Sequence, residues 1–421
     1  MNVKILLPLI LLPVALWAQK NPKAVPITEI QCVKCHSKGM KRISTPVTLY
    51  SKDIHFSAGL GCHDCHGGDP SYERWHGPRN PAQGFLGKPT ALEIPGLCDR
   101  CHGDAEYMRS FNPSLPVDQL PKYLTSRHGQ LLVNKKDLKV ATCASCHSVH
   151  DIRRPGDPVS PVYAVNLPET CARCHSDADY MAGYPVATTS QYEDFRASVH
   201  GTALLERGDI GAPACNDCHG NHGAFPPEVG SIAHVCGLCH VANAELYNSS
   251  FHAEIFSGLD EPGCETCHGN HKIVHPDESF LGEGPNATCA NCHEPTSDDA
   301  GFAVALGMKN VLDSLSTSFI SATDLVELSE QRGMEVSELK FDLRDVRQTL
   351  IRTRTTVHSF DDLEVKKVAE PGITLALEVI EKGHLTLVEH QRRRWWLGAA
   401  TVIILVLILG VYLKMREIER G

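Results

Sequence analysis

The sequence predicts a mainly α-helical and irregular fold in three parts: a long region of short helices and loops, an α-helical bundle, and one apolar C-terminal helix. Three observations carry this prediction. Eighteen cysteines lie in nine Cys-x-x-Cys-His motifs within residues 32–293 of a 421-residue chain. Apolar residues then recur every three or four positions between residues 304 and 357. Residues 395–413 contain no charged side chain.

The cysteines indicate the chemistry of the first part. Every cysteine belongs to a pair with two residues between, and a histidine follows each pair directly. This is the signature of covalent c-type heme attachment, in which two thiols bond to one porphyrin and the adjacent histidine ligates its iron. The sequence therefore predicts nine covalently attached hemes c.

In chain order, motifs 1 to 9 attach heme through Cys32 and Cys35, Cys62 and Cys65, Cys98 and Cys101, Cys143 and Cys146, Cys171 and Cys174, Cys215 and Cys218, Cys236 and Cys239, Cys264 and Cys267, and Cys289 and Cys292. The proximal iron ligands predicted from the same motifs are His36, His66, His102, His147, His175, His219, His240, His268 and His293.

Two other uses of cysteine fit the pattern less well. Zinc modules place a second ligand pair farther along the chain and do not require a histidine directly after the second cysteine. A disulfide framework would close very short loops, which add little stability, and no cysteine is left over to form longer ones. Heme attachment is therefore the interpretation that accounts for all the cysteines.

A repeat runs through the same region. Its unit is a histidine, a heme motif, a second or inner histidine, and a second heme motif. Clear copies begin at His128, His200 and His252, and in each the inner histidine lies three residues after the first motif. Because these histidines recur at fixed offsets from heme motifs, they are predicted to be distal iron ligands.

An earlier, looser copy begins at His55. Its position three residues after the motif is Asp69, so the inner histidine is either His76 or His63. Motif 1 stands outside the repeat and has His63, His234 or His275 as candidate distal ligands. The predicted distal ligands for the other eight irons are His55, His76, His128, His150, His200, His222, His252 and His271. The sequence leaves open which histidine serves which heme.

Residues 32–293, through their paired motifs and interleaved histidines, resemble the doubled-motif, low-potential multiheme cytochromes c, relatives of the small class III tetraheme cytochromes. The resemblance implies a membrane-anchored nonaheme member of that group. It also implies iron ligated by two histidines, closely packed hemes between which electrons tunnel, and mostly negative potentials. Stacked porphyrins would then replace an ordinary apolar core, wrapped by loops and short helices.

Beyond Pro295 the pattern predicts an antiparallel helical bundle. Gly333 separates two apolar stripes, and Pro371-Gly372 precedes a third helix expected at about residues 375–394. A spacer that holds the hemes off the membrane is the simpler interpretation, and a docking platform for a membrane partner is the alternative. His358, His384 and His390 are expected at the surface, with His358 the least improbable heme ligand among them.

The chain is expected to be exported and membrane-anchored. Residues 1–18 resemble a cleavable signal peptide, and residues 395–413 are long enough to span a bilayer. We therefore expect residues 19–300 to form a nine-heme domain in the periplasm, followed by a helical spacer at 301–394 and a cytoplasmic tail at 414–421. Arg392 to Arg394 would meet lipid headgroups.

The functional hypothesis is an electron conduit between a membrane quinol-oxidising partner, such as a cytochrome b-type subunit, and other periplasmic redox proteins or a surface acceptor. The net charge of −10 argues against nucleic acid as a partner. One alternative is an enzyme acting on a small nitrogen or sulfur oxyanion at one open heme. Long helices after the last heme also occur in octaheme hydroxylamine oxidoreductase and pentaheme nitrite reductase, although the lysine-ended motif of many nitrite reductases is absent. A structural subunit of a respiratory complex is the third hypothesis.

Overall fold

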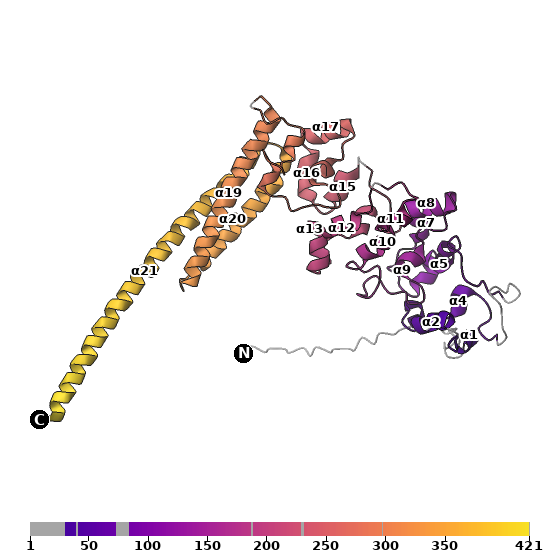
Figure 1. The fold of residues 1–421 in the computed structure, drawn as a ribbon, viewed down its shortest axis with the longest axis horizontal. Helices are drawn as coiled ribbons and strands as arrows, with labels where there is room; N and C mark the ends of the chain where they lie inside the picture. The colour runs from indigo at the N-terminus through magenta and orange to yellow at the C-terminus, as the bar shows by residue number, and fades with distance from the viewer. Residues whose placement is uncertain are drawn as a thin grey trace, which may run out of the picture. The chain divides into compact units, whose positions relative to one another are not determined.

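The computed structural model describes residues 30–38, 41–72, 84–186, 188–228, 231–296 and 298–420. Within these ranges the chain is helical or irregular, and the strand-like pairing found there is an isolated bridge between Gly67 and Phe85. The predicted fold class is confirmed (Figure 1). The expected signal peptide and His76 lie outside the described residues.

The chain divides into two compact units, Met1–Pro226 and Pro227–Gly421. Motifs 1 to 6 belong to the first unit, and motifs 7 to 9 share the second unit with the long C-terminal helices. The helices of the first unit are α1 (Gln31–His36), α2 (Lys41–Tyr50), α3 (Ile54–Ser57), α4 (Cys62–His66), α5 (Ile94–His102), α6 (Ala105–Arg109), α7 (Gln119–Thr125), α8 (Arg127–Asn134), α9 (Cys143–His147), α10 (Leu167–His175), α11 (Ala178–Met181), α12 (Gln191–Arg196), α13 (Val199–Gly201), the π-helical turn η3 (Thr202–Glu206) and α14 (Cys215–His219).

The second unit begins with short helices and ends with three long ones. They are α15 (Ile232–Gly237), α16 (Val241–Asn248), α17 (Phe251–Leu259), α18 (Gly263–His268), η5 (Glu278–Phe280), η6 (Cys289–Asn291), α19 (Ala300–Gln331), α20 (Ser337–Thr356), η7 (Val357–Ser359) and α21 (Asp362–Arg420).

Seven of the nine heme motifs lie wholly within an α-helical turn. Residues three and four positions apart occupy the same face of a helix, so the turn gathers both thiols and the imidazole on one side. The exceptions are motif 7, where α15 ends at Gly237, and motif 9, which starts in the 3-10 turn η6. Local secondary structure thus presents all three attachment groups in the motif's own turn.

Two of the outer histidines of the repeat sit in the first turn of a capped helix. The buried Ser126 hydroxyl accepts a hydrogen bond from the Gly129 amide at 2.9 Å, and Ser198 does the same for Gly201 at 3.0 Å. A serine at this position satisfies an amide that has no partner inside the helix. The cap therefore fixes the backbone that carries His128.

Replacing Gly129 with alanine should destabilise the protein. A Cβ atom there would overlap the carbonyl oxygen of Tyr123, which is backbone and has little room to move. Forcing an extra methyl group into such a site costs about 1–3 kcal/mol. Thermal unfolding of the heme-loaded protein should show the loss, whereas Gly156→Ala, which meets nothing within 4 Å, serves as the control. Equal stability of the two variants would contradict the packing argument.

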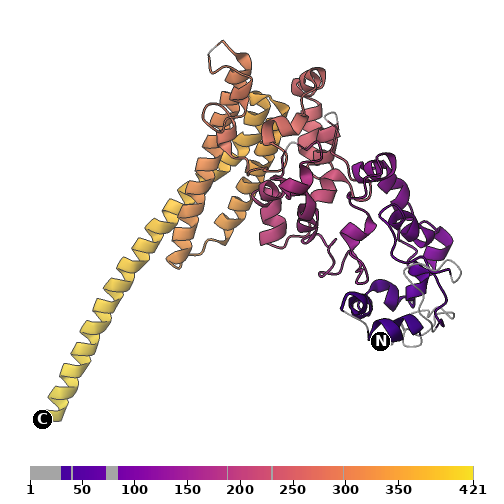
Figure 2. The ribbon, with the colours of Figure 1, turned by 45° about the vertical axis from the view of Figure 1, so that its right-hand side comes forward.

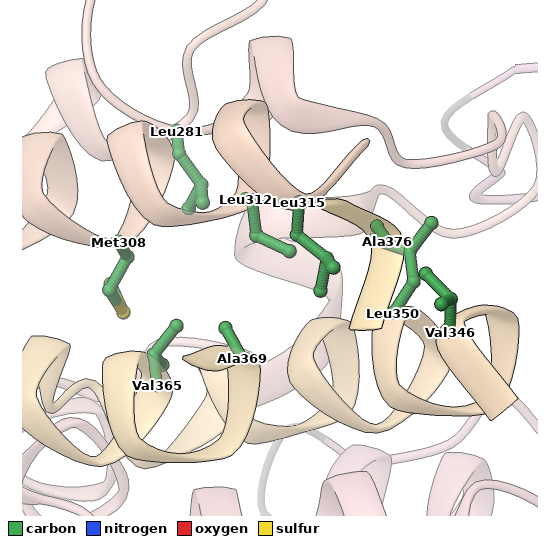
Figure 3. Packing of buried hydrophobic residues seen from close by; sticks show 9 residues of the cluster. All are labelled: Leu281, Met308, Leu312, Leu315, Val346, Leu350, Val365, Ala369 and Ala376. Carbon is green, nitrogen blue, oxygen red and sulfur yellow. The ribbon is translucent and has the colours of Figure 1, made fainter. Parts of the chain in front are cut away.

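The helical bundle has the apolar core that its sequence pattern predicts. Figure 3 shows side chains of α19, α20 and α21 meeting in one cluster, together with Leu281 from the segment after η5. Leu315, Val346 and Ala376 are fully buried there. A second cluster contains Ala322, Val326, Val336, Leu339 and Val379. Each of the larger side chains stabilises the fold by about 1.5–3 kcal/mol through burial.

The expected start of the third bundle helix near residue 375 is wrong. Helix α21 begins at Asp362 and continues through Pro371 to Arg420. Gly372 is buried against α20, where a Cβ would lie 2.7 Å from Thr349 Cγ2, and Gly383 has a similar approach to Leu325 of α19. Glycine here permits close helix packing, and tertiary contacts outweigh the helix-breaking tendency of the Pro-Gly pair.

The last part of α21 extends past the bundle as a single helix (Figures 1 and 2). It is the helix among the described residues that is long and apolar enough to cross a membrane. Trp395 and Trp396 are 81% and 71% exposed, and the apolar residues from 402 to 413 are similarly uncovered. By length and composition, this segment matches the hydrocarbon core of a bilayer.

Candidate heme sites

Pairs of imidazole rings face one another across nearly equal distances in the described part of the chain. Each pair contains one motif histidine and one histidine from elsewhere. The pairs and the distances between their ring centres are His55 with His102 at 6.0 Å, His66 with His150 at 6.0 Å, His128 with His175 at 6.1 Å, His147 with His222 at 6.2 Å, His252 with His293 at 6.2 Å, and His268 with His358 at 6.1 Å.

This separation fits a metal ion between the two rings. A bond from imidazole nitrogen to a transition metal is about 2 Å long, so two opposite ligating nitrogens lie about 4 Å apart. Each ring centre lies roughly 1 Å behind its nitrogen, which places the two centres about 6 Å apart. Since each motif also supplies two thiols, the residues present fit a covalently attached heme with two axial histidines.

The pairs fall into two classes that follow the sequence repeat. An outer histidine, which precedes the first motif of a copy, faces the second motif of the same copy; the interplanar angles are 87°, 69° and 66°. An inner histidine faces the first motif of the preceding copy, with nearly parallel rings at 21° and 12°. The copies that begin at His128 and His200 are therefore interlocked with the copies before them, because the inner histidine of each faces a motif histidine of the preceding copy.

Hydrogen bonds orient several of these rings. The Nδ1 atom of His66 lies 2.9 Å from the Gly87 carbonyl oxygen, and that of His219 lies 3.3 Å from Phe225 O. A carbonyl oxygen can only accept, so Nδ1 carries the proton and Nε2 is left with a free lone pair. His55 and His293 instead donate from Nδ1 to the carboxylates of Asp53, at 2.8 Å, and Asp299, at 3.0 Å. Such partners fix ring orientation and raise ligand basicity.

Burial favours the neutral, ligating form of these histidines. It lowers the pKa of His102, His128, His147, His150, His175, His222, His252, His268 and His358.

The cysteines of successive motifs lie next to one another. A hydrogen bond from the Cys98 thiol to Cys143 raises the pKa of Cys98, and burial adds to the effect. Cys171 with Cys215, and Cys236 with Cys264, form the same contact. In each case the first cysteine of a copy's second motif meets the first cysteine of the next copy. Heme attachment converts the sulfurs to thioethers, so these contacts matter as a measure of proximity.

Weaker electrostatic contacts join other neighbouring motifs. Burial raises the pKa of Cys62, Cys146 and Cys267 to about 11, with an added contribution from the thiols of Cys32, Cys171 and Cys289 respectively. The pKa of Cys65 is also raised, first by burial, then by the charge of Asp64, and then by the thiol of Cys101. Motifs 1 to 6 thus form one unbroken succession in the first unit, and motifs 7 to 9 form another in the second.

Five predicted distal histidines, namely His55, His128, His150, His222 and His252, lie opposite a motif histidine. His200 lies in α13 and His271 in the bend after α18, and both stay predicted ligands, as does His76. Among the alternatives for motif 1, His63 has a buried Nδ1 without a hydrogen-bond partner.

Sequence reasoning assigned His358 to the surface by default, yet its ring lies beside His268. The repeat itself contains the sequence signal that could have identified His358 as a ligand. Motif 8 is the first motif of the last copy, so no following copy supplies an inner histidine to face it.

The described residues contain no group of three or more His, Cys, Asp or Glu side chains arranged to hold a bare metal ion. A structural zinc site needs four converging ligands. Here the histidines meet in twos and the thiols lie beside them, which is the donor arrangement for porphyrin-bound iron.

The chain is similar to known cytochromes. A family model described as cytochrome c3 matches residues 54–176, and one described as cytochrome c554 and c-prime matches residues 16–67. No solved structure matches the chain.

Two curated relatives are multiheme proteins. The C-type polyheme cytochrome OmcC of Geobacter sulfurreducens is 25% identical over 29% of this chain and 14% of its own length. The multiheme cytochrome MtrA of Shewanella baltica is 27% identical over 50% of this chain and 51% of its own length. The chain therefore spans about half or less of the length of these relatives. Together with the nine Cys-x-x-Cys-His motifs and the ring pairs spaced for iron, these similarities support a multiheme c-type cytochrome.

Proposed function

We propose that this cytochrome carries nine hemes c and conducts electrons along them while its C-terminal helix holds it at a membrane. Bound heme supplies one-electron chemistry at each iron. The polypeptide positions the attachment sites, closes both axial positions and sets the surroundings that tune each potential. The observation that carries the proposal is the unbroken succession of motifs within each unit, in which a cysteine of each motif lies near a cysteine of the next.

Ring pairing supports conduction over catalysis at the six sites where it is seen. An iron held between two imidazoles has no open position for a substrate, whereas an oxyanion-reducing or oxyanion-oxidising enzyme needs one. The alternative of catalysis at one open heme would require an iron without a second protein ligand.

The test combines a heme count with the EPR spectrum of the purified oxidised protein. Nine hemes with only low-spin ferric signals would support a conduit whose irons are all closed. A stoichiometric high-spin signal would overturn that form of the proposal, and nitrite, hydroxylamine and sulfite would then be added to look for turnover. Near-parallel and near-perpendicular ring pairs give distinct low-spin signals, so the two classes of site can also be counted.

The exposed apolar end of α21 supports attachment to a lipid bilayer. We propose a single span at residues 395–413, with the heme-bearing part in the periplasm of the cell. Its partners would be a quinol-oxidising or cytochrome b-type membrane subunit and soluble redox proteins. Flanking the span, Arg392 and Arg393 pair with Glu389 at 2.7 Å and 2.9 Å, so part of this charge is already compensated within the helix.

Ending the chain at Arg394 should release it from the membrane with all nine hemes in place. The core clusters of the bundle end at Ala376 and Val379, well before the truncation, so folding should be unaffected. Cell fractionation with heme staining would measure the release. A control lacking only residues 414–421 keeps the apolar segment and should stay with the membrane. Membrane retention of the chain ending at Arg394 would contradict the proposed anchor.

Replacing Asp53 with asparagine should raise the potential of the heme at motif 3. Asp53 is 1% exposed and accepts from His55 Nδ1, from the His55 amide, and from the Ile152 amide at 2.7 Å. Burial works to raise the pKa of this carboxyl, but these bonds hold its pKa below the usual value. A carboxylate that accepts from the imidazole makes the ring a more basic ligand, and this stabilises ferric iron. Asparagine would stabilise ferric iron less, so the potential should rise.

Each tenfold change in relative stability of the two oxidation states shifts the potential by about 59 mV. Spectroelectrochemical titration should therefore show one heme in nine moving upward by tens of millivolts. Asp157→Asn is the control, because the Asp157 carboxylate accepts from the Val159 amide and from Arg153. An unchanged titration of the Asp53 variant would show that the carboxylate does not tune the iron.

A further inference from the structure

The corner between α20 and α21 lies against the last two heme motifs. It consists of the 3-10 turn η7 and Phe360, which adopts a left-handed backbone conformation with φ 55°. In the second unit this corner brings His358 to His268 of motif 8, with the ring centres 6.1 Å apart. Phe360 stacks on His252 at 3.9 Å, and His252 in turn faces His293 of motif 9.

The orientation of His358 suits a metal ligand. Its Nδ1 lies 3.0 Å from the Thr355 carbonyl oxygen, so Nδ1 carries the proton and Nε2 keeps its lone pair. The side-chain amide of Asn243, on α16, also lies 3.3 Å from this Nδ1, and a flip of the amide would present its oxygen as a second acceptor for the same proton. This is the hydrogen-bonding pattern seen at the motif histidine His66, whose Nδ1 also faces a carbonyl oxygen.

The geometry of this pair places it in the near-parallel class. Its interplanar angle is 22°, against 21° and 12° for the two pairs in which an inner histidine faces a first motif. The pairs of outer histidines lie between 66° and 87°. Motif 8 is itself a first motif, and its angle and distance therefore match what its position in the repeat requires.

We propose that His358 is the distal axial ligand of the heme at motif 8, supplied by the helical bundle in place of an inner histidine from a further repeat. This assignment rests on the proposed attachment of heme at Cys264, Cys267 and His268. With this assignment the helical bundle supplies an axial ligand to one heme, in addition to any role as a spacer.

Further contacts fix the corner in place. Arg354, one turn earlier on α20, pairs with Glu278 of η5 at 2.7 Å. Gly301, in the first turn of α19, packs so closely on the His293 ring that a Cβ atom would overlap it. These contacts hold the corner and the start of α19 against the segment that carries motifs 8 and 9.

The test is His358→Ala in the full chain, with His384→Ala on the exposed face of α21 as the matched control. The alanine variant should keep nine hemes, while one iron in nine changes from low-spin to high-spin ferric in the EPR spectrum. Its ferrous form should bind one carbon monoxide per chain, and added imidazole should restore the low-spin signal. The control should show none of these changes. A fully low-spin alanine variant would overturn the proposal.

A second variant covers the case in which His358→Ala does not fold. His358→Met retains a ligand, so it should stay low-spin while one near-parallel signal is lost and one potential rises. An unchanged EPR spectrum and titration of this variant would also overturn the assignment.

A measurement on the unaltered protein is independent of both variants. Diethyl pyrocarbonate should modify His384 while His358 stays protected, and modification of His358 in the oxidised low-spin protein would exclude it as a ligand. If the unaltered protein has fewer than nine hemes or an open iron, the proposed function fails instead, so the two failures are distinguishable.

Discussion

The polypeptide made without heme should fail to fold over residues 31–296, while α19, α20 and the first part of α21 remain helical. Ordering each residue costs about 1–2 kcal/mol of backbone entropy, which burial of apolar surface normally offsets. Among the described residues of the heme region, the large, fully buried apolar side chains are Ile30, Leu132, Pro168 and Leu204. The bundle alone has Met308, Leu315, Val326, Val346, Val365 and Val379 in that state.

Limited proteolysis of the chain, produced in cells that lack the heme-attachment machinery, would show which parts of the heme-free protein are folded. Cleavage should occur throughout the heme region and leave a resistant fragment that begins near residue 300. The heme-loaded protein under the same conditions is the control and should resist cleavage in both parts. If the heme-free chain were equally resistant, the porphyrins would not be the core, and the buried residues of the short helices would have to suffice.

Sequence periodicity was sufficient to predict the broad architecture. Heme attachment follows from local spacing, and the bundle follows from apolar stripes that repeat with the helical period, so neither needed knowledge of tertiary contacts. The start of α21 could not be predicted from Pro371-Gly372, because what keeps that segment helical is its packing against Thr349 and other residues far away in the sequence.

The pairing of histidines could not be read from the sequence for a similar reason. Fixed offsets identify which histidines recur, but the partner of an inner histidine lies in the preceding copy, as with His150 and His66. The amide of Ile54 bonds to the Ile152 carbonyl oxygen at 2.8 Å, and the Ile152 amide bonds to Asp53. These bonds hold the two copies together across about a hundred residues. His358 is expected at the surface by default because its own segment carries no repeat, although it is the least improbable ligand among the histidines of the bundle.

Removing the heme of motif 4 with Cys143→Ala and Cys146→Ala should interrupt conduction by more than the loss of one heme. Cys143 contacts Cys98 of motif 3, and Cys146 lies near Cys171 of motif 5, which adds to the rise that burial causes in the pKa of Cys146. Motif 4 is therefore the link between the hemes before it and those after it in the first unit. Electron tunnelling weakens steeply with distance, so hemes beyond the gap should exchange electrons far more slowly.

Voltammetry of the protein adsorbed on an electrode separates connection from simple heme loss. In slow scans the variant should pass eight electrons per chain, because every remaining heme has time to respond. In fast scans the charge should fall well below eight electrons per chain, since the gap isolates one group of hemes.

The matched control is Cys32→Ala with Cys35→Ala, which removes the heme of motif 1 at the end of the succession. That control should pass eight electrons at both scan rates, because motif 1 links no two other motifs. If the two variants behave alike in fast scans, electrons bypass motif 4, and the order of motifs along the chain is not the order of electron flow.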